Sequence, residues 1–133
     1  MTRQCMECGT KGMMPFEGAA EEVGHGGFAE TVEGLSGWKC VHCGSVVFTP
    51  ESMGRYSAAS DRVVLAARAV AGRELRRIRE KLGLEQKELA RLTGGGKNGP
   101  SRWELGKTPI SPAVMNLMRL LDRDPSRLEE LEG

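Results

Sequence analysis

The sequence of 133 residues contains no long run of apolar side chains. Spanning a bilayer as a helix requires about 20 consecutive apolar residues, and no segment approaches that length. The first residues, MTRQC, lack the apolar core and the cleavage site of a secretory signal peptide. We therefore expect a cytoplasmic protein with no membrane partner. In that compartment the four cysteines are not expected to form structural disulfides.

Sequence features typical of catalysis are also missing. There is no glycine-rich loop of the phosphate-binding type and no recognisable pair of nucleophile and general base. We therefore do not expect an enzyme.

The formal net charge of +1 conceals an asymmetry between the two halves of the chain. Residues 1–66 contain five basic and eight acidic side chains, whereas residues 67–133 contain fourteen basic and ten acidic ones. A basic half joined to an acidic half is typical of a nucleic-acid-binding module fused to a domain with another role.

The cysteines occur as two copies of one short motif, CMECG from residue 5 and CVHCG from residue 40. A Cys-x-x-Cys turn directs both thiolates to one side, so two such turns can complete a tetrahedral site. Three interpretations compete: structural zinc, which the spacing and the compartment favour, rubredoxin-like iron, and a redox dithiol pair. A closed four-thiolate zinc site has no position for a substrate and serves folding. The expected ligands are Cys5, Cys8, Cys40 and Cys43.

The segment between the two cysteine motifs is rich in glycine and glutamate. We expect residues 29–33 and 36–39 to pair as a small antiparallel sheet, and residues 45–49 to form a clearer strand because of their β-branched content. His25 and His42, the only histidines, are expected to be exposed and not to bind the metal, because four thiolates already complete the shell.

A connecting helix is expected after the metal-binding region. Thr49-Pro50-Glu51 combines a capping residue, a proline suited to the first turn and an acidic residue. We expect this helix to be interrupted near residues 57–60 and to end at a hinge at Gly72. The predicted domains are therefore residues 1–48 for metal binding, 49–71 for the connecting helix and 72–133 for a helical domain.

In the last of these domains apolar residues recur at helical spacing. Helix-start signals at residues 99–100, 111–112 and 124–125 add to two earlier amphipathic segments, so five short helices are expected. Residues 86–90, the glycines at 94–96 and the helix start at 99–100 form a helix, a turn and a second helix with polar opening residues. This is the order of elements in a helix-turn-helix. Trp103 and Leu105 are expected to point into the core.

The segment from Leu75 to Asp122 resembles the helix-turn-helix of phage-repressor-type (XRE) regulators. With its glycine turn, Asn98 and the sequence SRWE it resembles, more narrowly, the C-terminal domain of MqsA-type antitoxins. The resemblance implies that Asn98 and Arg102 enter the major groove of DNA, where Asn pairs with adenine and Arg with guanine. The alternative roles are a helix cap for Asn98 and a solvated charge for Arg102. The expected DNA-contacting residues are Gln86, Lys97, Asn98, Ser101 and Arg102. The alternative for Gln86 is that it is an ordinary exposed polar residue.

The resemblance covers the whole chain, from a YgiT-type zinc finger through a linker helix to the XRE-type domain. The implied fold is mainly α, with a small zinc-bound α+β N-terminal domain and a C-terminal five-helix helix-turn-helix domain. The resemblance also implies a homodimer joined through the C-terminal domains, a palindromic operator in double-stranded DNA, and a ribonuclease toxin bound by the zinc domain. A regulator without a toxin partner is the main alternative, and an iron electron carrier is a more distant one.

Overall fold

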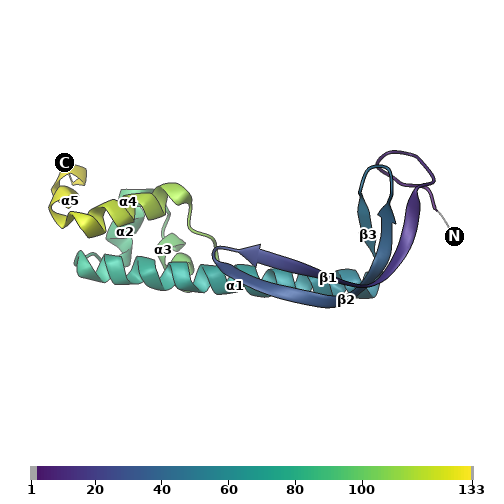
Figure 1. The fold of residues 1–133 in the computed structure, drawn as a ribbon. Helices are drawn as coiled ribbons and strands as arrows, with labels where there is room; N and C mark the ends of the chain where they lie inside the picture. Colours follow the sequence, from purple (N-terminus) through teal and green to yellow (C-terminus); the bar gives the residue numbers. More distant parts are fainter. Residues whose placement is uncertain (1–2, 133) are drawn as a thin grey trace. The chain divides into compact units, whose positions relative to one another are not determined.

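The computed structural model describes residues 3–132, and its elements follow one another as labelled in Figure 1. The strands β1 (Met13–His25), β2 (Phe28–Cys40) and β3 (Val46–Phe48) form one antiparallel sheet in that order. The long helix α1 (Pro50–Lys81) precedes α2 (Gln86–Thr93), α3 (Gly99–Glu104), α4 (Pro112–Arg123), the 3-10 turn η1 (Pro125–Arg127) and α5 (Leu128–Leu131). The chain divides between Val64 and Leu65, inside α1, into an N-terminal and a C-terminal unit.

The sheet is built on one long hairpin whose two strands each contain an irregularity. Pairing shifts between Phe16 and Ala19 and again between Ala19 and Glu21, so each strand accommodates one extra residue. Gly18 and Gly34 lie at these points with φ of 69° and 68°, a left-handed conformation that glycine adopts without strain. The bulges bend and twist the hairpin locally.

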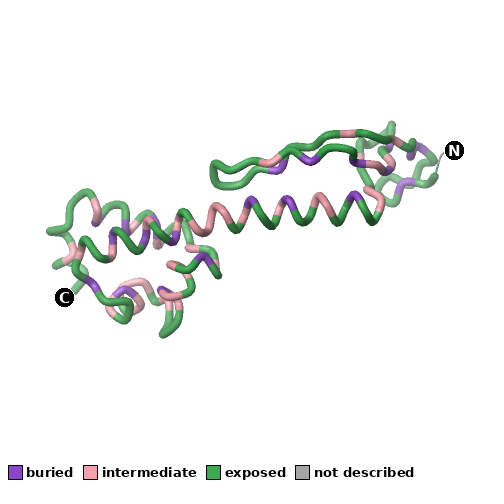
Figure 2. Tube along the Cα trace, turned by 90° about the horizontal axis from the view of Figure 1, so that it is seen from below, coloured by how far each residue is buried: buried purple, intermediate pink, exposed green. Residues whose placement is uncertain are grey.

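The N-terminal unit has a small core between the hairpin and the first half of α1. It consists of Val23, Val32, Leu35 and Ala59, with Phe48 and Tyr56 packed against it. Figure 2 shows the buried positions on the hairpin and on this part of α1. The expected helix start is confirmed, because the Thr49 hydroxyl accepts a hydrogen bond from the Ser52 backbone N–H at 3.3 Å.

Two expectations about local structure were wrong. Residues 29–33 and 36–39 do not pair with each other but belong to the single strand β2, whose partner β1 was not expected. The connecting helix has neither an interruption near residues 57–60 nor an end at Gly72, since α1 continues to Lys81. The three-part division of the chain by role stays a prediction.

The C-terminal unit contains the end of α1 and the helices α2 to α5. Its core is formed by Leu75 and Ile78 of α1, Leu89 of α2, and Met115, Met118 and Leu121 of α4. Helix α4 begins as expected, because the Ser111 hydroxyl accepts a hydrogen bond from the Val114 backbone N–H at 3.2 Å. Helices around one apolar core were expected here and are present, but the first of them is the end of the 32-residue α1 and not a separate short helix.

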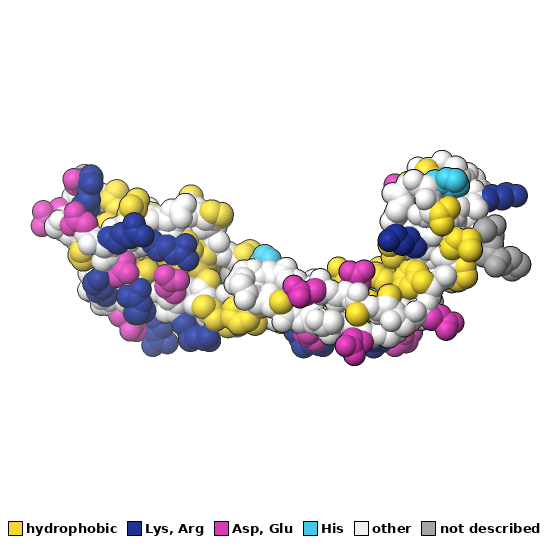
Figure 3. All heavy atoms as spheres, viewed as in Figure 1, with side chains coloured by type: hydrophobic (Ala, Val, Ile, Leu, Met, Phe, Trp, Pro, Cys, Tyr) yellow, Lys and Arg dark blue, Asp and Glu magenta, His cyan; other side chains and the backbone are white. Residues whose placement is uncertain are grey.

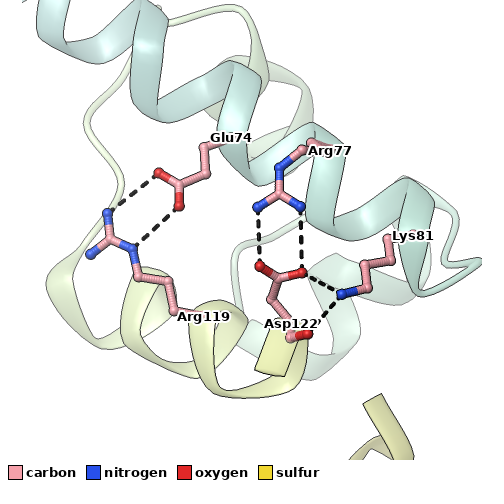
Figure 4. A network of polar contacts seen from close by, with 5 residues as sticks. All are labelled: Glu74, Arg77, Lys81, Arg119 and Asp122. Carbon is pink, nitrogen blue, oxygen red and sulfur yellow. Dashed lines mark hydrogen bonds and ion pairs between the residues drawn. The ribbon is translucent and has the colours of Figure 1, made fainter. Parts of the chain in front are cut away.

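Ion pairs connect α1 to α4 on the surface of this unit. Arg77 and Lys81 of α1 both donate to the Asp122 carboxylate, and Arg119 of α4 faces Glu74 of α1 (Figure 4). The hydrogen bonds from Arg77 and then Lys81 lower the pKa of Asp122 to about 2. Asp122 is therefore ionised at neutral pH, and the pairs fix α4 along α1.

Among residues 3–132 there is no helix with the length and apolar character needed to cross a membrane.

The two glycines inside α1 are predicted to respond in opposite ways to alanine. A Cβ at Gly54 would have nothing within 4 Å, so Gly54→Ala should raise the free energy of unfolding of the N-terminal unit by about 0.5–1 kcal/mol. A Cβ at Gly72 would lie 2.4 Å from the Trp103 carbonyl oxygen, so Gly72→Ala should destabilise the C-terminal unit by about 1–3 kcal/mol. Residue-resolved amide hydrogen exchange measures both. Equal stabilisation by the two substitutions would contradict the close helix packing at Gly72.

Candidate functional site

The four cysteine sulfurs lie together at one end of the sheet. All four Sγ atoms are within 4.8 Å of one another, and the pairs Cys5–Cys43 and Cys8–Cys40 are 3.6 Å apart. A tetrahedron of thiolates around a metal with bonds of about 2.3 Å has sulfurs about 3.8 Å apart. The arrangement therefore fits one metal ion held by Cys5, Cys8, Cys40 and Cys43.

Both cysteine motifs fold in the same way. The backbone N–H of Gly9 donates to the Cys5 carbonyl and that of Gly44 to the Cys40 carbonyl, each at 2.9 Å. The two glycines have φ of 76° and 78°, which explains why glycine follows the second cysteine in each motif. Cys5 and Cys40 are buried beside Met13 and Trp38, while Cys8 and Cys43 lie on the exposed side of the cluster.

Thr10 was not expected to be part of this site. Its hydroxyl lies 3.1 Å from the Cys8 sulfur and 3.9 Å from the Cys40 sulfur. Ser45 occupies the equivalent place after the second motif, and its carbonyl accepts from the Cys40 backbone N–H as that of Thr10 accepts from Cys5. The repeated hydroxyl residue after Cys-x-x-Cys-Gly was the available sequence signal.

The thiols of the cluster differ in pKa. Backbone N–H groups of Cys43 and His42 lower the pKa of Cys40 to about 6, and hydrogen bonds with Thr10 lower the pKa of Cys8. The backbone N–H of Ser45 favours the thiolate of Cys43, but desolvation and the neighbouring thiols raise its pKa to about 12. Four adjacent sulfurs cannot all ionise without a cation, which is the chemistry of a metal–thiolate centre.

The two histidines do not belong to the group of side chains that converges at the cysteine cluster. Within residues 3–132 the convergent group consists of the four cysteines, and both His25 and His42 are exposed. Among the described residues, the candidate metal ligands that converge here are therefore sulfur atoms alone.

In the C-terminal unit the glycine segment makes room for an aromatic ring. A Cβ at Gly95 would lie 2.4 Å from the Trp103 indole, and a Cβ at Gly99 would reach van der Waals contact with the same ring at 3.8 Å. Half-buried Trp103 packs against the core as expected. Leu105 does not, because it is 65 % exposed, and the expectation that it belongs to the core was wrong. It follows the last residue of a short helix and lies beyond the packed face.

The side chains expected to contact DNA lie on α2, the turn and α3. Gln86, Lys97, Asn98 and Arg102 are exposed, and Ser101 is half-buried. Asn98 occupies the N-cap position of α3, but its side chain makes no capping hydrogen bond. Arg102 has no ion-pair partner among the described residues. Figure 3 shows Lys and Arg side chains gathered over the helices of this unit.

Gln86 differs from the other four residues because its side chain is held within the protein. Its amide nitrogen donates to Glu104 at 3.1 Å, and Glu104 also accepts from Arg79 at 2.8 Å. The alternating charges of residues 73–81 are typical of a solvated helix face, but the Arg79 side chain is only 13 % exposed.

The comparisons with known proteins agree with the motifs of the two units. The family described as "Antitoxin component of bacterial toxin-antitoxin system, MqsA" matches residues 3–132. The chain belongs to the MqsA antitoxin family. Antitoxin MqsA of Escherichia coli strain K12 is 34 % identical over 102 residues, which cover 75 % of this chain and 78 % of that relative. This is an antitoxin family and not a known enzyme family, and membership implies a toxin partner.

The metal centre can be tested with two substitutions in one cysteine motif. Cys43→Ser removes one of the four thiolates, so metal analysis after dialysis against a chelator should show loss of bound metal. Amide protection around Met13 and Cys40 should fall with it, because metal binding and folding are coupled in such sites. Signals from α2 to α4 should not change. His42→Ala, in the same turn, should retain its metal, and metal loss in this variant would contradict the four-cysteine assignment.

Proposed function

We propose that the C-terminal unit is a helix-turn-helix that binds operator DNA and represses transcription. Helix α2, the turn at residues 94–98 and α3 supply the required order of elements. The observation that carries the proposal is the pair Asn98 and Arg102, which are four residues apart at the start of α3, exposed and not engaged within the unit. Side chains at this spacing lie on one helix face.

These two residue types suit the major groove. Asparagine can bond adenine and arginine can bond guanine through two hydrogen bonds each. Lys97 precedes Asn98 and Ser101 precedes Arg102, and both can contact phosphates, as can Gln86 at the start of α2. Pro100, buried beneath this segment, fixes the first turn of α3 and leaves the side chains of Asn98 and Arg102 directed outward in the proposed complex.

The test of DNA binding removes one base-contacting side chain. Arg102→Ala should weaken binding to a duplex selected by the unaltered chain from a random pool, by about 5- to 150-fold, and relax the sequence preference at one position. Melting behaviour should be unchanged, since Arg102 is exposed. Arg73→Ala, another exposed arginine of this unit, is the control and should have little effect. Equal affinity of the Arg102→Ala variant would remove this residue from the interface.

We also propose that the repressor is a homodimer joined through its C-terminal units. A groove of about 370 Å³ runs between α4 and α5, with leucine side chains along it. Leu120 is 62 % exposed and Leu131 43 %, and both side chains line this groove. A symmetric pair would cover this apolar surface and direct two α3 helices at a palindromic operator.

Association through this groove can be tested by introducing a charge. Leu120→Glu should raise the dimer dissociation constant by at least about tenfold, measured by analytical ultracentrifugation, because it places a carboxylate in the apolar contact. Leu105→Glu introduces the same charge at a 65 % exposed leucine outside the groove and should leave association unchanged. If the two variants associate equally, another surface forms the dimer.

The proposed role of the N-terminal unit is to bind and neutralise the toxin. Its metal is zinc in this proposal, since a closed four-thiolate centre in a cytoplasmic DNA-binding protein suits structural zinc; a purified chain should then be colourless, whereas ferric iron in such a site is red. The hairpin carries exposed acidic side chains, visible in Figure 3, that suit a basic ribonuclease. Family membership favours this role over that of a regulator without a toxin partner.

A further inference from the structure

Glu104 is a nearly buried carboxylate that connects three helices of the C-terminal unit. Its side chain is 5 % exposed, and its two oxygens accept hydrogen bonds from the Arg79 guanidinium at 2.8, 3.1 and 3.2 Å. One of these oxygens, Oε2, also accepts from Nε2 of Gln86 at 3.1 Å. Arg79 lies on α1, Gln86 begins α2 and Glu104 ends α3.

We propose that Glu104 is a positioning residue for DNA binding, which holds the Gln86 amide so that it can donate to a phosphate. The proposal rests on the DNA-binding function proposed above and deepens it. An ionised carboxylate only accepts hydrogen bonds, so the Gln86 nitrogen, and not its oxygen, must face Glu104. The second hydrogen of that nitrogen is then available for an anionic oxygen.

Restraining the Gln86 side chain in the free protein should strengthen the complex with DNA. An exposed glutamine loses rotamer freedom when it binds a phosphate, and that loss weakens association. Gln86 is exposed but already restrained by its bond to Glu104, so much of the ordering has taken place in the free protein.

Arg79 explains how a carboxylate can lie beside a phosphate contact without repelling it. The guanidinium of Arg79 is only 13 % exposed and pairs with both oxygens of Glu104, which neutralises the local charge. It also donates to the Leu84 carbonyl at 2.9 Å, two residues before Gln86, and so fixes the loop that leads into α2. Of the other charges near the start of α2, Glu85 and Lys87 form a weak exposed pair at 3.5 Å, and the Glu88 carboxylate accepts a hydrogen bond from the Glu85 backbone N–H at 3.2 Å.

The experiment compares Gln86→Ala, Glu104→Gln and the double variant on two duplexes. One duplex is selected by the unaltered chain from a random pool, and the other is its shuffled sequence. A phosphate contact carries no sequence information, so each single variant should lose about two- to tenfold in affinity on both duplexes. The double variant should lose no more than Gln86→Ala alone, because Glu104 acts through Gln86.

Asp122→Asn is the matched control, since it weakens two other ion pairs between helices of this unit, neither of which involves Gln86. Its affinity for both duplexes should be unchanged at temperatures where circular dichroism shows every variant folded. A purely structural role for Glu104 predicts additive losses in the double variant, and either that result or a gain in affinity for Glu104→Gln would overturn the proposal.

A measurement on the unaltered chain covers the case in which Glu104→Gln does not fold. Nitrogen relaxation should show the Gln86 side-chain amide more rigid than that of exposed Asn98, which makes no capping bond. Equal mobility of the two amides overturns the proposal. If the unaltered chain selects no duplex at all while Gln86 is rigid, the proposed DNA-binding function fails and the restraint on Gln86 is purely structural.

Discussion

The close packing of α3 on α1 is the constraint on which the C-terminal unit depends. Helix α3 has only six residues, too few to be stable alone, so its orientation must come from its surroundings. Gly72 allows the end of α3 to approach the α1 backbone, and the pair Arg79–Glu104 fixes the two helices from the side. Trp103, seated against Gly95, ties the preceding turn to the same core. The exposed residues Asn98 and Arg102 take their positions from these buried contacts.

The N-terminal unit is stabilised by a different interaction. Its apolar core consists of few and mostly small side chains, so hydrophobic burial supplies limited stabilisation. At the other end of the sheet the buried cysteines replace a second apolar core, with Met13 and Trp38 packed beside them. A bound metal would neutralise the thiolates and join the segment before β1 to the segment after β2. The two units therefore depend on different interactions, a cluster of four cysteine sulfurs in one and helix packing in the other.

Much of this arrangement could be predicted from residue spacing, because spacing reports directly on local geometry. The repeated Cys-x-x-Cys-Gly motif indicated the four converging sulfurs, and periodic leucines with proline and serine starts indicated the short helices. Strand β1 was missed for a physical reason. Its buried and half-buried positions, Met13, Phe16, Ala19 and Val23, are three or four residues apart because a bulge interrupts the alternation.

The contacts that orient the candidate DNA-binding residues could not be predicted in the same way. Arg79, Gln86 and Glu104 are far apart in the sequence, and in an amphipathic helix a charged residue usually indicates a solvated face. Similarly, Gly72 was interpreted as a hinge because glycine is unfavourable inside helices. The structure shows that its lack of a side chain serves close packing instead. Local sequence patterns identify residues with a structural role, but they do not identify the distant residues that these contact.

Strand β1 is an edge strand of the sheet, and this position affects the tendency of the chain to aggregate at high concentration. In the described part of the chain β1 pairs with β2 on one side, and on the other side only Met13 is paired, through an isolated bridge to Arg3, so most of its 13 residues have backbone groups with no neighbouring strand. Edge strands that are long, flat and apolar pair with strands from other molecules and so lead to aggregation. Here Pro15, the bulge around Gly18, and the charges of Glu21 and Glu22 make the edge irregular and repulsive. These features oppose edge-to-edge pairing between copies of the chain.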